Sequence, residues 1–434
     1  ASPDFGCSML DLETILPRGL SPGTFSPVAL GLLSAVCAGH AAFLVSCLNL
    51  IYARHWPRKL LKVCRYSCEL TILAAPFLFL ATFDVAFGQP AATSVPGIVW
   101  SSYAQVCVLI GATVVPVMMV LRGLRREPAA GQSHTREIVD VARELGYTPI
   151  GEGKHRRLAR LPFNEIFQVE FSERVLVVPR LPEAWDGLSI LHLTDLHLRG
   201  VPDLPFYQFL MERCRALEPD IVVLTGDIVD SEKHHRWIVP VLGKLRWKQA
   251  AFAILGNHDY WYDPELSRRR LARLGIQVLG NSWRKLELAG QPLIAIGHEG
   301  PWFVPEPNLT ACPTEGFRLC LSHTPDNIHW AAAHQIDLML AGHVHGGQIR
   351  FPLIGSVFVP SRFGRRYDCG LFQEGPTTMY VSRGLAGQHP VRYNCRPEIT
   401  RLVLRCPRVL AAAEALQLEE RLSSTTMPPS RKRA

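Results

Sequence analysis

Residues 189–230 read SILHLTDLHLRGVPDLPFYQFLMERCRALEPDIVVLTGDIVD and contain two short apolar runs, each followed at once by a polar block. The runs are Ser189–Leu193 and Asp220–Leu224, and Pro205–Leu217 between them has the apolar spacing of a helix. Short runs rich in Val, Ile and Leu are typical of parallel strands that are covered on both faces. The stretch therefore predicts a strand–helix–strand unit of an α/β fold, with polar residues where each strand ends.

The same alternation continues toward the C-terminus. Three more apolar runs are expected to be strands: Ala251–Leu255, Arg318–Leu321 and Ile336–Leu340. The polar blocks beside them are Gly256–Asp259, Ser322–His323 and Gly342–Gly347. Because ligands of open α/β sheets bind where the strands end, five polar blocks at five strand ends indicate one site.

The residue types in these blocks indicate a metal centre. Asp195 and His197 are two positions apart, so on an extended segment both side chains point the same way. His343 and His345 repeat that spacing. Carboxylate oxygen and imidazole nitrogen without thiolate suit Zn, Mn or Fe. There are more candidate ligands than one tetrahedral ion needs, which favours two ions of the kind that assist phosphoryl displacement.

The order and spacing of the blocks resemble the calcineurin-like metallophosphoesterase superfamily, whose pattern is D-x-H, G-D-x-x-D, G-N-H-[DE], H and G-H-x-H. All five blocks are complete here, and the resemblance covers roughly Phe163 to Arg405. It implies an α/β sandwich of two mixed β-sheets flanked by helices. It also implies a hydrolase that acts on phosphoric ester or phosphoanhydride bonds.

The resemblance assigns a role to each position. Two divalent ions (Mn, Fe or Zn) would be held by seven metal ligands: Asp195, His197 and His345 on one ion, Asn257, His323 and His343 on the other, and Asp227 bridging both. A hydroxide activated by the metals would attack phosphorus. His258 would face the substrate and protonate or stabilise the leaving oxygen, and Asp230 would orient His258 through a hydrogen bond. Ser231 stands where protein Ser/Thr phosphatases of the superfamily carry Arg-Gly, which counts against a phosphoprotein substrate.

Two further segments are expected near the site. His298 and Glu299 follow the apolar run Leu293–Ile296, and His389 lies beside Gly384–Gly387, a loop that suits close approach of the backbone. For any single histidine of the chain, however, a core or surface position is the commoner alternative.

The segment before this domain is strongly apolar. Val28–Tyr52 and Ile98–Leu121 contain no charged residue, and Leu70–Phe87 contains only Asp84. A bilayer core of ~30 Å needs about 20 apolar residues per helix, so two stretches are long enough and Leu70–Phe87 is marginal. Three such stretches are too many for a signal peptide, and they predict an integral protein of the inner or plasma membrane.

Basic residues near the apolar stretches predict the orientation. They follow the first stretch at Arg54, Arg58, Lys59, Lys62 and Arg65, and the third at Arg122, Arg125 and Arg126. The loop Gly88–Gly97 has none. Since cytoplasmic flanks carry the excess of Lys and Arg, the catalytic domain is expected in the cytoplasm. If the second stretch does not insert, the orientation inverts.

The chain is therefore expected to have five parts: a flexible tail (1–26), a three-helix transmembrane region (27–126), a basic linker (127–162), the catalytic domain (163–406) and a C-terminal tail (407–434). Within the linker, Thr135–Leu145 has a helical spacing. The cluster Lys154–Arg160 either binds anionic lipid or is a solvated linker, two alternatives that the sequence leaves open. The net charge of +8 suits an anionic substrate or membrane surface.

The resulting hypothesis is a membrane-anchored phosphoesterase with two metal ions, acting on a phosphodiester, pyrophosphate or phosphomonoester. Gly346–Gln348 and Arg396–Ile399 resemble the membrane-associated bacterial branch of the family, which includes a UDP-diacylglucosamine hydrolase, so a lipid-linked substrate is expected. The alternative is an inactive membrane scaffold, although such proteins typically lack residues that are all present here. No nucleic-acid partner is expected, because the chain has no basic platform interleaved with aromatic residues.

Overall fold

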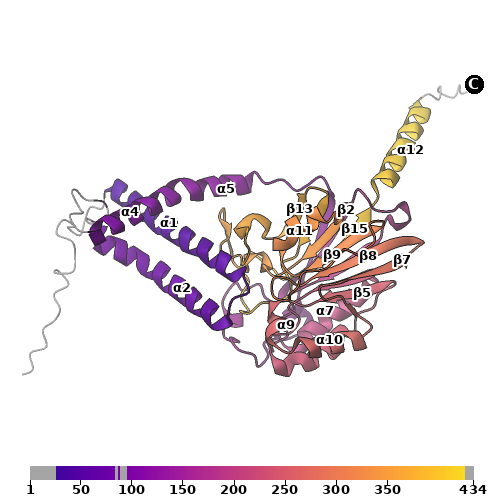
Figure 1. The fold of residues 1–434 in the computed structure, drawn as a ribbon, viewed down its shortest axis with the longest axis horizontal. Helices are drawn as coiled ribbons and strands as arrows, with labels where there is room; N and C mark the ends of the chain where they lie inside the picture. Colours follow the sequence, from indigo (N-terminus) through magenta and orange to yellow (C-terminus); the bar gives the residue numbers. More distant parts are fainter. Residues whose placement is uncertain (1–25, 84–86, 88–94, 426–434) are drawn as a thin grey trace, which may run out of the picture. The chain divides into compact units, whose positions relative to one another are not determined.

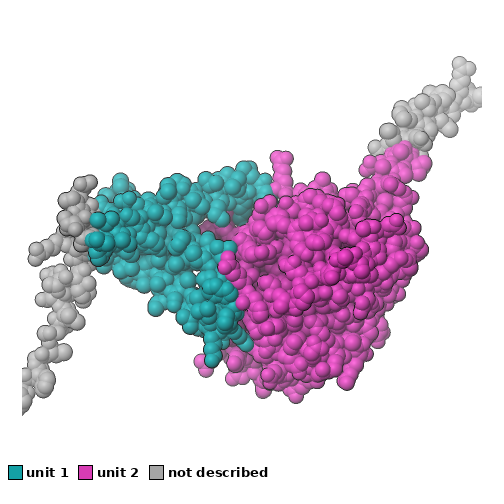
Figure 2. Space-filling view, in the orientation of Figure 1, with its two compact units in different colours: residues 1–52, 56–125 teal, residues 53–55, 126–434 magenta. Residues whose placement is uncertain are grey.

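The computed structural model describes residues 26–83, 87 and 95–425. The tail expected over residues 1–26 lies outside them except for Ser26, and so do Asp84, most of the loop Gly88–Gly97 and residues 426–434. The described residues form two units (Figure 2). One holds the residues up to Tyr52 together with Trp56–Arg125, and the other holds Ala53–His55 and all residues from Arg126 onward.

The first unit consists of apolar helices. They are α1 (Pro27–Tyr52), α2 (Arg58–Ala81) and a third helix made of α4 (Val95–Leu109), a π-helical turn η2 (Ile110–Val114) and α5 (Val115–Gly123). By length and composition, all three could cross a membrane.

The second helix begins earlier than the sequence indicated. It was expected over Leu70–Phe87, but it begins at Arg58, so basic residues predicted for a loop lie on its first turns. Long Lys and Arg side chains bury their stems along apolar surface and keep their charged ends in water. A spanning helix can therefore start among charges that a search for uncharged runs excludes.

Helix α1 and the third helix touch through their backbones. A Cβ atom at Gly39 would lie 1.8 Å from the carbonyl oxygen of Cys107, and one at Gly111 would lie 2.0 Å from that of Ala35. Close contacts between small residues are a common way to pack helices in a bilayer, where lipid competes for apolar side chains.

The second unit contains two sheets (Figure 1). The seven-stranded sheet has the order β1 (Gly131–Asp140), β2 (Gln168–Val177), β15 (Glu398–Arg405), β3 (Ser189–Leu193), β4 (Ile221–Thr225), β5 (Ala250–Ile254) and β6 (Gln277–Val278). The six-stranded sheet has the order β13 (Gly370–Glu374), β14 (Thr377–Val381), β10 (Leu338–Ala341), β9 (Phe317–Ser322), β8 (Gln291–His298) and β7 (Trp283–Leu288). Strands β3, β4, β5 and β6 pair in parallel, and so do β8, β9, β10 and β14. The predicted sandwich of two mixed sheets is confirmed.

Successive side chains of a strand pack into two different cores, one on each face of the sheet. Ile221 and Val223 of β4 join Leu319 and Leu321 of β9 in a core between the two sheets. Val222 and Leu224 point the other way, into a core shared with helices α7 and α10. A strand buried on both faces must be apolar at every position, which is why these runs showed no alternation in the sequence.

Helices cover the outer faces of the sheets. They are α6 (Val141–Leu145), α7 (Leu204–Ala216), α8 (Ile238–Leu242), α9 (Asn257–Trp261), α10 (Pro264–Arg273) and α11 (Ile328–Ala333), and α12 (Pro407–Thr425) follows the last strand. A two-residue pair, β11 (Arg350–Phe351) with β12 (Gly355–Ser356), follows the fifth polar block. In Figure 1, α7, α9 and α10 lie together on one side of the sheets.

The prediction of a helix over Thr135–Leu145 is wrong for its first half. Residues 131–140 form β1, which pairs antiparallel with β2 as an edge strand, and the helix begins only at Val141. The Asp140 carboxylate accepts a hydrogen bond from the backbone N–H of Arg143 and caps the short helix there. Pairing within the sheet outweighs local spacing here.

A buried ion pair at the start of β15 makes stability dependent on pH. The Glu398 carboxylate accepts hydrogen bonds from Arg383 Nε at 3.2 Å and from the Tyr380 hydroxyl at 2.7 Å. Burial raises the pKa of Glu398, but the Arg383 guanidinium outweighs it and lowers the pKa from 4.5 to about 2. Since the folded pKa is the lower one, the stabilisation is present above pH 4.5 and is lost as pH falls toward 2.

We expect Glu398→Gln to lower the free energy of unfolding by about 3 kcal/mol at pH 7 and by much less near pH 2. Denaturant unfolding of the full chain in detergent at both pH values measures the difference. Glu173→Gln is the matched control, because Glu173 is a half-exposed partner of Arg401 on the same sheet, and a change of about 0.5 kcal/mol or less is expected. An equal loss at both pH values would contradict the assignment.

Candidate metal centre

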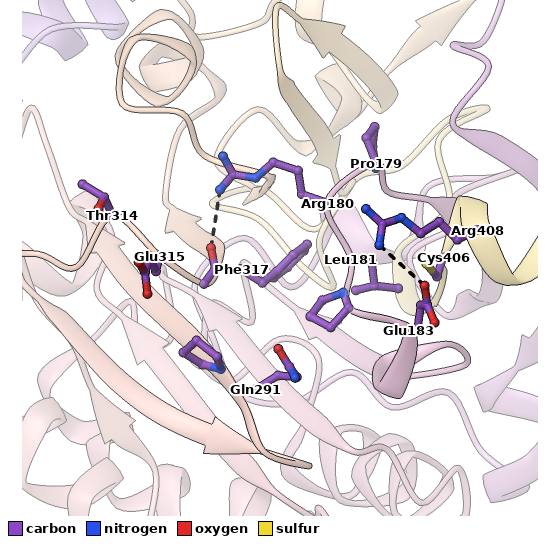
Figure 3. A pocket seen from close by; sticks show the side chains of 13 residues that line it. Pro179, Arg180, Leu181, Glu183, Gln291, Thr314, Glu315, Phe317, Cys406 and Arg408 are labelled. Atoms are coloured by element: carbon purple, nitrogen blue, oxygen red, sulfur yellow. Dashed lines mark hydrogen bonds and ion pairs between the residues drawn. The ribbon is translucent and has the colours of Figure 1, made fainter.

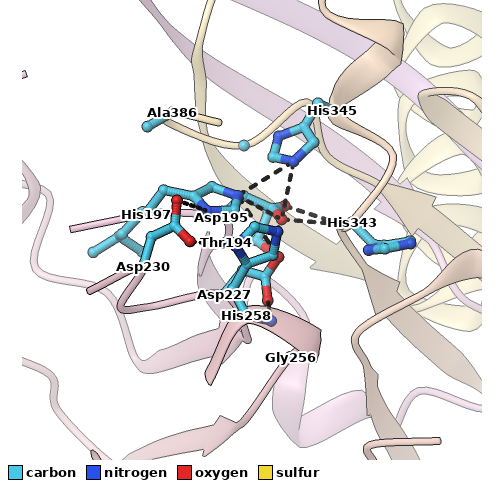
Figure 4. Close-up of polar contacts among 12 residues, drawn as sticks. Thr194, Asp195, His197, Asp227, Asp230, Gly256, His258, His343, His345 and Ala386 are labelled. Carbon is cyan, nitrogen blue, oxygen red and sulfur yellow. Dashed lines mark hydrogen bonds and ion pairs between the residues drawn. The ribbon is translucent and has the colours of Figure 1, made fainter. Parts of the chain in front are cut away.

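The structure brings all nine predicted site residues to one end of the sandwich. They come from five segments, each after the carboxyl end of a strand: Asp195 and His197 after β3, Asp227 and Asp230 after β4, Asn257 and His258 after β5, His323 after β9, and His343 and His345 after β10. Strands β3, β4 and β5 belong to one sheet, while β9 and β10 belong to the other. The site therefore lies where strand ends of both sheets meet, and Figure 4 shows several of these side chains converging.

A first group of three residues could hold one metal ion. Asp195, His197 and His345 direct their ligand atoms toward one point. The His197 and His345 Nε2 atoms are 3.3 Å apart, and His345 Nε2 is 3.7 Å from Asp195 Oδ1. Asp195 itself is held in place, because its Oδ2 accepts hydrogen bonds from the Thr194 hydroxyl and from the backbone N–H of His343.

A second group lies beside the first. Asp227, His323 and His343 could hold an ion together, and the Asn257 side-chain oxygen is 3.1 Å from His323 Nε2. The backbone carbonyl of Thr225 lies 2.7 Å from His323 Nδ1, which leaves Nε2 of that ring directed at the site. A carbonyl that fixes the ring in this way is the usual partner of a ligating histidine.

Asp227 connects the two groups. Its Oδ2 is 3.6 Å from His197 Nε2 in the first group, and its Oδ1 is 3.4 Å from His323 Nε2 in the second. The backbone N–H of His258 also donates to Asp227 Oδ1 at 2.8 Å. One carboxylate thus presents an oxygen to each group, as a bridging ligand does.

The backbone at these positions is strained. Five of the candidate ligands have left-handed conformations although none is glycine: Asp195 (φ 53°), His197 (φ 44°), Asp227 (φ 53°), His343 (φ 70°) and His345 (φ 52°). Such conformations cost of order 1–3 kcal/mol each and are found mostly at functional sites. The glycine before His343 allows the two sheets to meet, because a Cβ atom at Gly342 would lie 2.1 Å from the Thr194 hydroxyl.

The electrostatics fit cations. Burial, reinforced by neighbouring histidines, holds the pKa of His343 and of His345 well below the usual value, so both rings are neutral and keep a lone pair. Burial alone would also lower the pKa of His323, but Asp227 and Asp195 outweigh it and raise the pKa to about 9. Among the described residues, the buried His343 Nε2 has no hydrogen-bond partner. Carboxylates, neutral imidazoles and this unsatisfied nitrogen are the donor set that two divalent ions require.

A histidine–aspartate pair stands next to the two groups. His258 Nδ1 is hydrogen-bonded to Asp230 Oδ1, and the rings of His258 and His197 are 4.6 Å apart. Burial raises the pKa of Asp230, but His258 outweighs it and holds the pKa well below its usual range. Asp230 is therefore an anion that fixes the orientation of the His258 ring.

Sequence reasoning missed Arg199. Its Nη1 donates to Asp230 Oδ2 at 2.7 Å, so Asp230 is held between a histidine and an arginine. The signal was available, because Arg199 continues the two-residue spacing of Asp195 and His197.

Arg392 was also missed, and no motif marks it. Its guanidinium is fully buried and donates to the carbonyl oxygens of His345 at 3.0 Å and Arg383 at 2.9 Å, as well as to that of Ala386. It thereby ties the loop that carries His345 to the loop that follows β14.

The two segments expected near the site contact neighbouring segments of the chain and contribute no candidate ligand. The His298 carbonyl accepts from the His323 N–H, and Glu299 accepts from the Leu255 N–H and pairs with Arg268. The His389 carbonyl accepts from the Gln348 side chain at 2.9 Å. None of the three belongs to the groups that could hold a metal.

A cavity of about 560 Å³ opens at the other end of the sheets, beside the first residues of β8 and β9 (Figure 3). Its two arginines pair with carboxylates: Arg180 with Asp337 at 2.8 Å, and Arg408 with Glu183 at 3.6 Å. The cavity is thus separate from the metal centre and presents no comparable set of ligands.

Comparison with known proteins yields a family match. Residues 188–347 match the family model described as calcineurin-like phosphoesterase. The chain is 35% identical over 228 residues to the phosphodiesterase YaeI of Escherichia coli (strain K12), which covers 50% of this chain and 82% of that protein.

Two other relatives have names that mention a membrane or a lipid. The chain is 34% identical over 248 residues to the transmembrane protein with metallophosphoesterase domain of Danio rerio, covering 52% of this chain and 55% of that protein. It is 27% identical over 288 residues to the UDP-2,3-diacylglucosamine pyrophosphatase LpxG of Chlamydia muridarum (strain MoPn / Nigg), covering 52% of this chain and 87% of that protein.

Proposed function

Because the chain belongs to the calcineurin-like phosphoesterase family and is a hydrolase of phosphoric ester bonds, we propose that it is a membrane-anchored enzyme with two metal ions. The observation that carries the proposal is the Asp227 carboxylate, which has one oxygen toward each of two groups of ligands. The proposed ligands are the seven residues of those groups, and the proposed catalytic pair is His258 with Asp230.

The chain's own residues have separate tasks in this proposal. Divalent ions held by the two groups would supply an activated water and would screen the charge of the phosphoryl group. His258 faces the leaving oxygen and provides a proton or a hydrogen bond to it. Asp230, itself held by Arg199, keeps the His258 ring in one orientation. Arg392 ties the loop of His345 to the loop that follows β14.

The proposed substrate is a phosphodiester or pyrophosphate attached to a lipid. Three helices that could cross a membrane support it, because they would keep the enzyme at a bilayer. The name of the chlamydial relative refers to a pyrophosphatase that acts on UDP-2,3-diacylglucosamine, a lipid linked to a nucleotide. The proposed location of the catalytic domain is the cytoplasm, supported by basic residues at the start of α2 and after Gly123.

A scaffold without activity is the second candidate, and the site argues against it. A scaffold has no need for strained ligand positions, yet five of the seven proposed metal ligands have left-handed conformations. The catalytic histidine is also present, with its orienting carboxylate.

The test is hydrolysis by the purified full-length protein supplied separately with Mn, Fe or Zn. We expect bis-p-nitrophenyl phosphate to be hydrolysed with at least one of these metals, and we expect a membrane-extracted phospholipid or nucleotide-lipid to be turned over. If only the soluble diester is hydrolysed, the lipid substrate is wrong and the phosphodiesterase remains. If no phosphate ester is hydrolysed although both metals are bound, the scaffold is favoured.

A further inference from the structure

Two loops of the catalytic unit expose large apolar side chains. Phe163 is 90% exposed and Leu353 is 83% exposed. Their neighbours Leu161, Ile349, Phe351 and Ile354 are between 37% and 51% exposed. These six side chains are called the apolar patch below. Exposed apolar groups that cluster in this way commonly mark a binding surface.

The two loops are joined through one residue. The Tyr393 hydroxyl donates to the carbonyl of Pro162 at 2.9 Å, and the Tyr393 carbonyl accepts from the backbone N–H of Arg350 at 2.9 Å. Arg365 Nη1 donates to the carbonyl of Ile354 at 3.0 Å and secures the tip of the second loop. The apolar patch is therefore a single held surface rather than two unrelated loops.

The backbone holds the two most exposed side chains outward. Phe163 has φ 60° and Leu353 has φ 63°, a left-handed conformation that is rare for large side chains and costs of order 1–3 kcal/mol. Both loops thus combine a strained backbone with an apolar side chain left in water, two unfavourable features that an unseen binding partner would explain.

The apolar patch is continuous with the metal centre. Ile349 follows Gln348, whose side chain donates to the carbonyl of His389 at 2.9 Å. Three residues after His389, the Arg392 guanidinium donates to the carbonyl of the candidate ligand His345 at 3.0 Å. A molecule bound to the patch would lie next to the segment that supports the site.

A group of exposed cations adjoins the apolar patch in the sequence. It consists of Lys154, Arg156, Arg157 and Arg160, and Arg160 directly precedes Leu161. None of the four pairs with a carboxylate in the part of the chain that the structure describes. Apolar side chains beside unpaired cations are the combination that binds the surface of an anionic bilayer.

We propose that the apolar patch and these four cations dock the catalytic unit on an anionic membrane surface. Phe163 and Leu353 enter the apolar boundary of the bilayer, while the cations contact lipid phosphates. The consequence for catalysis rests on the function proposed above: docking would bring a lipid-linked phosphodiester to the metal centre. A second copy of this chain is the weaker occupant, because a two-fold interface would set the same four cations against each other.

The experiment uses hydrogen exchange of the full chain in nanodiscs. Discs of phosphatidylcholine alone are compared with discs that also contain phosphatidylserine. We expect backbone amides of residues 158–164 and 350–356 to exchange about tenfold more slowly in the anionic discs. The double variant Phe163→Ser/Leu353→Ser and the triple variant Arg156→Gln/Arg157→Gln/Arg160→Gln should both lose this protection. Leu416→Ser removes an equally large side chain that is 62% exposed on α12, and it should keep the protection.

Each outcome decides the proposal. Equal exchange in both kinds of disc, or protection that survives the double and triple variants, overturns docking on lipid. Protection that follows the number of chains per disc instead of the lipid assigns the surface to a second copy and also overturns it. Hydrolysis of bis-p-nitrophenyl phosphate in the same samples separates the two ideas, because its absence contradicts the proposed function without affecting the exchange measurement.

Discussion

Replacing Asp227 by alanine is expected to abolish the retention of both metal ions and to lower kcat/KM on bis-p-nitrophenyl phosphate by about 10³-fold or more. The reason is geometric, because Asp227 is, among the residues that the structure describes, the carboxylate with an oxygen toward each group of ligands. Several kcal/mol of transition-state stabilisation depend on bound metal, and each 1.36 kcal/mol is a factor of ten. Elemental analysis of the folded protein and steady-state kinetics measure the two effects.

Asp220→Asn is the matched control for this variant. Asp220 directly precedes β4, whereas Asp227 follows its other end, so both aspartates flank one strand. Asp220 accepts hydrogen bonds from the backbone N–H and hydroxyl of Ser189 and contacts no ligand candidate. It should keep its metals and activity. Full metal content in Asp227→Ala would contradict the bridging role.

Replacing His258 by alanine is expected to separate catalysis from metal binding. His258 is oriented by Asp230. It could form a third group of ligands with His197 and Asp230, but it belongs to neither of the two groups that Asp227 connects. We expect kcat to fall by about 10²–10⁴-fold, the usual effect of removing a general acid, while metal content stays unchanged. The loss should shrink for substrates with a good leaving group, because such a group needs less protonation.

Exposed His329 provides the comparison for His258. His329→Ala removes an imidazole of α11 that lies 3.7 Å from the Glu374 carboxylate, and it should leave kcat unchanged. A variant at His258 that loses metal as well as activity would make His258 a ligand instead of a catalytic residue. A variant that keeps its activity would favour the scaffold.

Most of the sandwich and the nine converging site residues could be predicted because each depends on a short local stretch of sequence. Strands β3, β4, β5, β9 and β10 are short apolar runs, and the site residues follow them, so sequence order places Asp195, Asp227 and His343 at the strand ends. The resemblance to a known family then supplied the roles.

The features that were missed depend on contacts between distant segments. Strand β1 has helical spacing in places and is a strand only because β2, about thirty residues later, offers its edge. Arg392 supports His345 from 47 positions away, and no spacing rule links them. The start of α2 was missed for another reason, since a bilayer allows Arg58 and Lys59 at a helix end that a search for uncharged runs rejects.

The left-handed turns at the ligand positions link folding to cation capture. Holding Asp195, His197, Asp227, His343 and His345 in this geometry costs the empty protein energy that a bound ion can offset. Bound ions would then hold the strand ends of the two sheets together. A shortage of metal would therefore destabilise this end of the sandwich as well as abolish activity.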